Sequence, residues 1–157
     1  MYRDRGFHPL HIGDTLRGEQ PTDPELLVFD KIGHGTTSTV WLCRNALDNV
    51  WCAVKVVSAR DSRLRKLRGI AKKQYPPELR ALIELKDMDT RKTHVVTPTN
   101  HFWIEGPNGR HLCLTMPLLG PSIRYAIEKT NNLPLAKELL FQVAKGIAFL
   151  RSCHICH

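Results

Sequence analysis

The strongest constraint on this chain is a pair of glycines at a predicted strand turn, followed by a strand with one internal lysine. Residues 33–40 read GHGTTSTV and residues 52–56 read CAVKV. Glycines between runs rich in Val, Thr and Trp are typical of a β-hairpin. The period of a strand places Ala53 and Lys55 on one face and their neighbours on the other. A lysine inside an apolar strand is costly unless its ammonium reaches a partner, so Lys55 is a candidate functional residue.

The remaining pattern predicts an α+β fold built on a five-stranded antiparallel sheet. Residues 1–25 are rich in Gly, Pro, Asp and Arg without periodicity, and we expect an extended N-terminal arm. Residues 105–109, Glu-Gly-Pro-Asn-Gly, indicate a hairpin between the last two strands. Strands are expected at 26–33, 38–44, 50–57, around 95–104 and at 111–116, and helices at 78–86 and 139–150.

Composition narrows the class of protein. The chain has 157 residues with 42% hydrophobic and 24% charged content, which suits one globular domain with a real core. No apolar run approaches the length of a membrane span, and no apolar signal segment follows Met1, so neither membrane insertion nor secretion is predicted. Five cysteines without a disulfide pattern favour a reducing compartment, the cytoplasm or the nucleus.

The net charge is +8, which favours acidic partners without choosing among them. Much of this charge lies between residues 60 and 73, which contain seven Lys and Arg side chains, at 60, 63, 65, 66, 68, 72 and 73. We interpret the run as a solvated helix face or loop, with a nuclear-import or anion-docking patch as the alternative. Non-specific nucleic-acid binding is a weaker hypothesis, and no nucleic-acid partner is predicted.

The hairpin has the chemistry that a nucleoside triphosphate needs. Glycines at 33 and 35 would let backbone N–H groups approach phosphates, and Lys55 would supply a positive charge to the α and β phosphates. Val40 and Ala53 are small and apolar enough to enclose an adenine between them. The segment is not a Walker A loop, because no Gly-Lys-Ser/Thr follows the glycines. It is not a Rossmann fingerprint, because a strand follows the turn.

These residues resemble the N-terminal part of a eukaryotic Ser/Thr protein kinase, and more narrowly the SR-protein kinase family with its fungal relatives. The matching segments cover nearly the whole chain. They are Gly6 to Asp14, Ile32 to Leu42 with Ser-Thr-Val-Trp at 38–41, Ala53 to Val57, Val95-Val96, and Gly106 to Gly120.

The resemblance implies a role for each matching position. Residues 33–40 would cover the phosphates, with Ser38 in place of a third glycine. Met116 would be the gatekeeper behind the adenine, and 117–119 would be the hinge that offers a carbonyl and an N–H. Glu78 would pair with Lys55 from the helix. The implied ATP site comprises Ile32, Gly33, His34, Gly35, Thr36, Thr37, Ser38, Val40, Ala53, Lys55, Glu78, Met116, Pro117 and Leu119.

The resemblance also implies a division into an arm at 1–25, a kinase small lobe at 26–117, and a hinge with the start of the large lobe at 118–157. The sequence ends at His157, which aligns with the histidine of the family's catalytic loop. The catalytic Asp, the Asn and the Asp-Phe-Gly motif are therefore not among these residues, so no catalytic or metal-binding residue is assigned. We expect this chain alone to be inactive, with Ser/Arg-rich proteins as the substrates of a full-length form.

Two departures from the family concern prolines. Pro76-Pro77 precedes Glu78, so that glutamate would lie in the first turn of its helix, where its pairing with Lys55 is uncertain. Pro98 lies inside the strand expected around 95–104, where it would remove one ladder hydrogen bond.

Two other functions remain as alternatives. A non-catalytic kinase-like module could keep the nucleotide pocket or the N-terminal arm as a docking surface. Residues 153–157 read CHICH, a string seen where haem is attached or zinc is bound. Four ligands within five residues cannot easily surround one tetrahedral ion, so we interpret this string as a coincidence.

Overall fold

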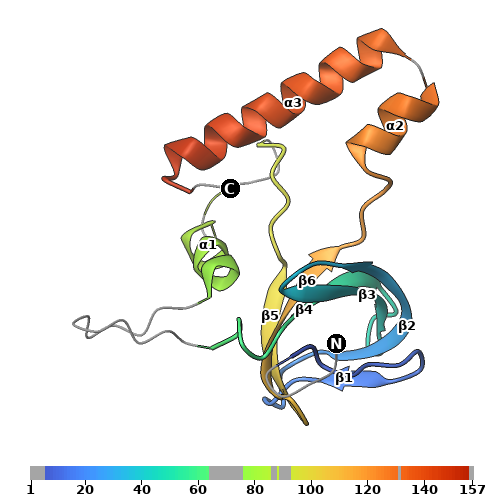
Figure 1. The fold of residues 1–157 in the computed structure, drawn as a ribbon, viewed down its shortest axis with the longest axis vertical. Coiled ribbons are helices and arrows are strands. Elements are labelled where there is room, and N and C mark those ends of the chain that lie inside the picture. Colours follow the sequence, from blue (N-terminus) through green and yellow to red (C-terminus); the bar gives the residue numbers. More distant parts are fainter. Residues whose placement is uncertain (1–5, 64–75, 86–87, 89–92, 131, 156–157) are drawn as a thin grey trace. The chain divides into compact units, whose positions relative to one another are not determined.

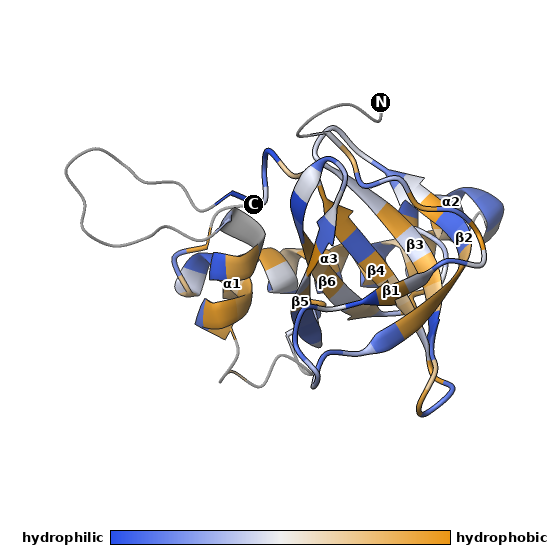
Figure 2. Ribbon diagram, turned by 90° about the horizontal axis from the view of Figure 1, so that it is seen from below, coloured by the Kyte–Doolittle hydropathy of each residue, from blue (hydrophilic) through white to orange (hydrophobic). Residues whose placement is uncertain are grey.

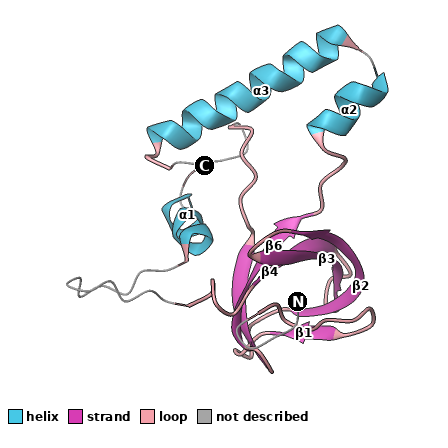
Figure 3. Ribbon diagram, in the orientation of Figure 1, coloured by secondary structure: helices cyan, strands magenta, loops and turns pink. Residues whose placement is uncertain are grey.

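A computed structural model describes residues 6–63, 76–85, 88, 93–130 and 132–155. These residues contain six strands and three helices (Figures 1 and 3). The chain divides into two compact units, Met1–Arg80 with Pro98–Leu118, and Ala81–Thr97 with Leu119–His157. The elements are β1 (Thr15–Arg17), β2 (Glu25–His34), β3 (Ser38–Asn45), β4 (Trp51–Val57), α1 (Pro77–Leu85), β5 (Asn100–Gly106), β6 (Gly109–Pro117), α2 (Ile123–Thr130) and α3 (Leu133–Ser152).

The first unit is dominated by one antiparallel sheet with the strand order β1-β2-β3-β4-β6-β5. The five predicted strands are all present, and the sixth described strand, β1, comes from the segment predicted to be an extended arm. The sheet is strongly curved (Figure 1). Its curvature brings the segment after β1 back to the far edge strand, where the Glu19 N–H donates to the Trp103 carbonyl at 2.9 Å.

The main hydrophobic cluster lies on one face of this sheet, and Figure 2 shows apolar and polar residues alternating along the strands. Leu112 and Leu114 of β6 are also buried, on the opposite face. As predicted from the strand period, Cys52, Val54 and Val56 share the core face of β4. Leu10 and Leu16 also belong to this core, at 6% and 2% exposure. The N-terminal segment therefore contributes side chains to the core, whereas the sequence pattern indicated an extended arm that packs on the domain without being a core element.

The strand expected around 95–104 begins only at Asn100. Pro98 therefore lies before β5, and its missing N–H removes no hydrogen bond of that strand. The neighbouring Thr99 N–H already donates to the Thr115 carbonyl at 2.8 Å. The prediction of a broken ladder at Pro98 is wrong because the strand starts after the proline.

The second unit contains α2, which the sequence pattern did not reveal, and α3, which is longer than the predicted 139–150. The early start of α3 has a local cause. Asn132 caps the helix by accepting a hydrogen bond from the Leu135 N–H at 3.0 Å, and Pro134 occupies the first turn. None of the described helices is long and apolar enough to cross a bilayer.

Two imidazoles meet where the N-terminal segment packs on β6. The rings of His8 and His111 lie 5.0 Å apart between centroids, and His111 is completely buried. Burial, together with the neighbouring His111, lowers the pKa of His8 from 6.5 to about 4. Burial also lowers the pKa of His111, although its Nδ1 lies 2.9 Å from the Val57 carbonyl oxygen. The folded chain therefore favours two neutral rings.

This pair predicts a loss of stability in mild acid. Above about pH 6.5 both rings are neutral whether the chain is folded or unfolded, so their contribution is fully present. As pH falls from about 6.5 toward 4, the unfolded chain binds protons that the folded chain refuses, and the free energy of unfolding decreases. Urea unfolding should show a lower midpoint at about pH 5 than at about pH 7.

The variant His8→Gln should make this pH dependence shallower. His11→Gln serves as the control, because the His11 side chain is 82% exposed. An unfolding midpoint that does not change between about pH 7 and pH 5 would contradict the prediction.

Candidate functional site

The predicted phosphate-covering loop is the hairpin between β2 and β3. His34 and Thr39 are the last paired residues, and the Gly35 N–H donates to the Ser38 carbonyl at 2.8 Å. The tip is also tied to the chain after β4, because the Thr37 carbonyl accepts the Ser58 N–H at 2.7 Å. These hydrogen bonds fix both ends of the exposed tip. Its remaining backbone N–H groups could therefore face a ligand.

The fold itself has no need for glycine in this loop. The backbone at Gly33 and Gly35 does not adopt the left-handed conformation that favours glycine. An added Cβ at Gly33 would make only ordinary contact with the Val40 Cβ at 3.5 Å, and one at Gly35 would meet nothing within 4 Å. The absence of a side chain at both positions leaves room for a ligand to approach the backbone closely.

The strand register brings the other predicted residues to one face of the sheet. Val40 pairs with both Gly33 and Lys55, and Ala53 pairs with Met116. Directly paired residues of antiparallel strands project to the same side, and Ala53 and Lys55 are two apart. These five residues therefore share the face opposite the core cluster, across β2, β3, β4 and β6.

Three predicted residues are placed less directly. Ile32 lies at a bulge in β2 and is 47% exposed, and Pro117 ends β6 in register with Cys52. Leu119 is 60% exposed and belongs to the second unit. The side chain of Glu78 lies outside the described residues, so its predicted pairing with Lys55 stays a prediction.

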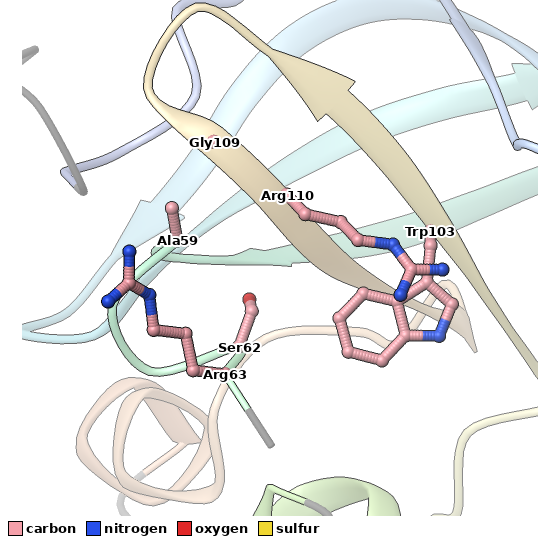
Figure 4. Close-up of a pocket in the computed structure, with 6 residues that line it drawn as sticks. All are labelled: Ala59, Ser62, Arg63, Trp103, Gly109 and Arg110. Atoms are coloured by element: carbon pink, nitrogen blue, oxygen red, sulfur yellow. The ribbon is translucent and has the colours of Figure 1, made fainter. Parts of the chain in front are cut away.

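Two of the cavities in the first unit are lined entirely by described residues that include neither Lys55 nor the Gly33–Val40 loop. One, of about 610 Å³, is lined by Met116 and Pro117 of the predicted site together with residues such as Trp51, Cys52 and Thr115. The other, of about 360 Å³, has two arginines in its wall (Figure 4). Sequence reasoning missed this second cavity because its residues come from three separate segments with no shared motif.

The cysteines do not form an evident reactive or metal site in the described residues. Burial raises the pKa of Cys43 to about 12 and also raises those of Cys52 and Cys113, so the thiolate form is disfavoured. In the part of the chain that the structure describes, no three His, Cys, Asp or Glu side chains gather in a way that could hold a metal ion. Cys156 and His157 of the CHICH string lie outside the described residues.

An antiparallel sheet with a glycine hairpin, a lysine strand and a helix after it defines the small lobe of a protein kinase. The crystal structure of a kinase domain, PF14_0431, superposes with a TM-score of 0.56 at 25% identity, covering 81% of this chain and 35% of that one.

Three proteins with similar sequences are protein kinases. The Ser/Thr protein kinase SKY1 of Saccharomyces cerevisiae is 28% identical over 169 residues, covering 99% of this chain and 21% of that protein. Human SRSF protein kinase 3 is 30% identical over 164 residues (99% and 26%), and protein kinase dsk1 of Schizosaccharomyces pombe is 27% identical over 164 (99% and 28%). No family profile matches the chain.

These findings confirm the resemblance predicted from the motifs: over nearly its whole length the chain is similar to SR-protein kinases and their fungal relatives. The chain spans about a quarter of the length of the curated relatives that it matches.

Proposed function

We propose that the sheet face beneath the β2–β3 hairpin binds ATP. Backbone N–H groups of residues 33–38 would contact the phosphates, and the Lys55 ammonium would neutralise charge on the α and β phosphates. Val40 and Ala53 would enclose the adenine, with Met116 behind it. The observation that carries this proposal is the register that sets Lys55 opposite Val40, next to a glycine tip that the fold does not require.

The remaining contacts of the proposed site come from the hinge and the helix. The carbonyl of Pro117 and the N–H of Leu119 would pair with the adenine edge, since proline keeps its carbonyl and leucine keeps its N–H. Glu78 would pair with Lys55. This assignment treats residues 26–117 as the small lobe and 118–157 as the hinge and the start of a large lobe.

The reaction that this site would serve is phosphoryl transfer from ATP to Ser or Thr of Ser/Arg-rich proteins, in the cytoplasm or nucleus. Such transfer needs an aligned nucleophile and metal-bridged phosphates. The residues that supply these in the family are not among the 157 here, so we propose that this chain alone binds ATP without transferring phosphate.

Thermal denaturation with a non-hydrolysable ATP analogue tests nucleotide binding directly. A ligand that binds only the folded state stabilises it by an amount set by its concentration relative to the dissociation constant. The Tm of the 157-residue chain should rise progressively with the analogue. A cooperatively unfolding chain whose Tm is unchanged at millimolar analogue would refute the proposal. Phosphate transfer to a Ser/Arg peptide above the level of a Lys55→Ala chain would refute the inactivity.

A further inference from the structure

The cavity of about 360 Å³ lies where the chain leaves β4 and passes the turn between β5 and β6 (Figure 4). It contains none of the residues proposed to bind ATP. Its lining combines two guanidinium groups, one indole and three small residues: Arg63, Arg110, Trp103, Ala59, Ser62 and Gly109. Arg63 and Arg110 lie on opposite sides of Ser62, with the Arg110 guanidinium over Trp103 and that of Arg63 on the side of Ala59 (Figure 4).

Arg110 is held in place before any ligand arrives. Its Nε and Nη2 donate to the Glu19 carboxylate at 2.6 and 2.5 Å, and its guanidinium lies 4.5 Å from the centre of the Trp103 ring. Glu19 is itself fixed by its backbone bond to Trp103. A guanidinium has five N–H donors, so the two bonds to Glu19 leave three for another acceptor. A preorganised fork of this kind loses little entropy on binding.

Arg63 supplies charge that the fold does not neutralise. Within the described residues it makes no ion pair, whereas its neighbour Arg60 lies 3.7 Å from Asp61, and Arg110 has Glu19 together with Glu105 at 3.9 Å. The chain at Arg63 is anchored by the preceding residue, because the Ser62 hydroxyl accepts the Leu112 N–H at 2.9 Å. Arg63 is therefore the cation of this cavity that is available for an external anion.

The small residues keep the cavity open. Gly109 adopts φ +115° at the turn, and an added Cβ there would come within 3.3 Å of the Ala59 Cβ. The Ser62 hydroxyl donates to the Val57 carbonyl at 3.3 Å and accepts a hydrogen bond from the Leu112 N–H. Its hydrogen-bonding partners are therefore found within the protein. Recognition would therefore fall to the two arginines and the indole edge.

We propose that this cavity binds the phosphoryl group of a phosphoserine or phosphothreonine in a partner peptide. A phosphate monoester presents three acceptor oxygens and a charge between −1.5 and −2, which matches the spare donors of Arg110 together with Arg63, whose exposed side chain would turn toward the ligand. A carboxylate has two oxygens and one charge and would satisfy fewer of these donors. The chain's net charge of +8 also favours an acidic partner. This proposal does not depend on ATP binding at the hairpin face.

Fluorescence anisotropy can test it with a labelled alanine-rich heptapeptide that carries one central phosphoserine. The phosphopeptide should bind the 157-residue chain at least about tenfold more tightly than the unphosphorylated serine peptide does, since charge-assisted hydrogen bonds are stronger than neutral ones. Arg63→Gln should weaken phosphopeptide binding about tenfold. Arg60→Gln is the matched control, because it removes the same charge three residues away from a side chain that does not line the cavity.

Glu19→Gln separates recognition from a merely structural role. It removes the negative charge that competes for Arg110 but keeps an amide oxygen that can still accept a hydrogen bond from the guanidinium, so phosphopeptide binding should become tighter even though the chain loses an ion pair and some stability. Equal binding by the Arg63→Gln and Arg60→Gln chains would overturn the proposal. An aspartate peptide binding as tightly as the phosphopeptide would overturn the choice of phosphate, and inorganic phosphate competing at the peptide's own concentration would overturn the choice of a peptide.

Discussion

Replacing Lys55 by alanine is expected to weaken binding of a non-hydrolysable ATP analogue at least about tenfold, or roughly 1.4 kcal/mol. The reason is electrostatic. Two unit charges about 4 Å apart attract by roughly 4 kcal/mol near a protein surface, and part of that is offset by lost hydration. Lys55 lies opposite Val40 at the base of the hairpin, where the phosphates would lie. Isothermal calorimetry or thermal-shift titration would measure the loss.

Lys31→Ala is the matched control for this experiment. It removes the same charge from the same sheet, but the Lys31 ammonium lies 5.6 Å from the centre of the Trp41 ring, and Lys31 pairs with Trp41 on the core side of β3. The analogue should bind this variant nearly as well as the unchanged chain. An equal loss in the two variants would mean that general positive charge, and not a site at Lys55, attracts the nucleotide.

The variant Lys55→Arg tests whether positive charge alone is enough at this position. Arginine keeps the charge but presents a wide planar fork in place of a compact ammonium. If the site needs a point charge beneath the hairpin, this variant should bind the analogue less well than the unchanged chain and better than Lys55→Ala. Binding restored in full would show that charge alone matters at this position.

The second large effect concerns stability. Leu16→Ala should lower the free energy of unfolding by about 2–5 kcal/mol, because its side chain is only 2% exposed and a cavity would remain in the core. Total stabilities of about 5–15 kcal/mol make this a large fraction. Urea unfolding monitored by tryptophan fluorescence would measure it. The change tests whether residues before Glu25 are part of the domain.

Leu47→Ala is the control for that measurement, since Leu47 lies in the turn after β3 and is 88% exposed. It should alter the free energy of unfolding by less than about 0.5 kcal/mol. If Leu16→Ala cost no more than Leu47→Ala, the N-terminal segment would be an arm that contributes nothing to the core. If the two midpoints differ as expected, deleting the residues before Glu25 should lower the free energy of unfolding at least as much as Leu16→Ala does.

Local patterns predicted the central strands well. The period of β4 placed Cys52, Val54 and Val56 in the core, and the glycine turn identified the β2–β3 hairpin. These features depend on residues close together in sequence, where alternation and turn chemistry act directly. The same reasoning placed the start of the strand expected around 95–104 too early, since an apolar pattern does not show where pairing with the neighbouring strand begins.

The sequence by itself determined the glycine hairpin and the lysine strand from which we predict a nucleotide site, because both are local patterns that depend on residues close together in the chain. Only the tertiary structure decided that Leu10 and Leu16 belong to the core and that Glu19, Arg63, Trp103 and Arg110 surround one cavity. The curvature of the sheet brings its edges together, and such long-range contacts leave no periodic trace in any single segment.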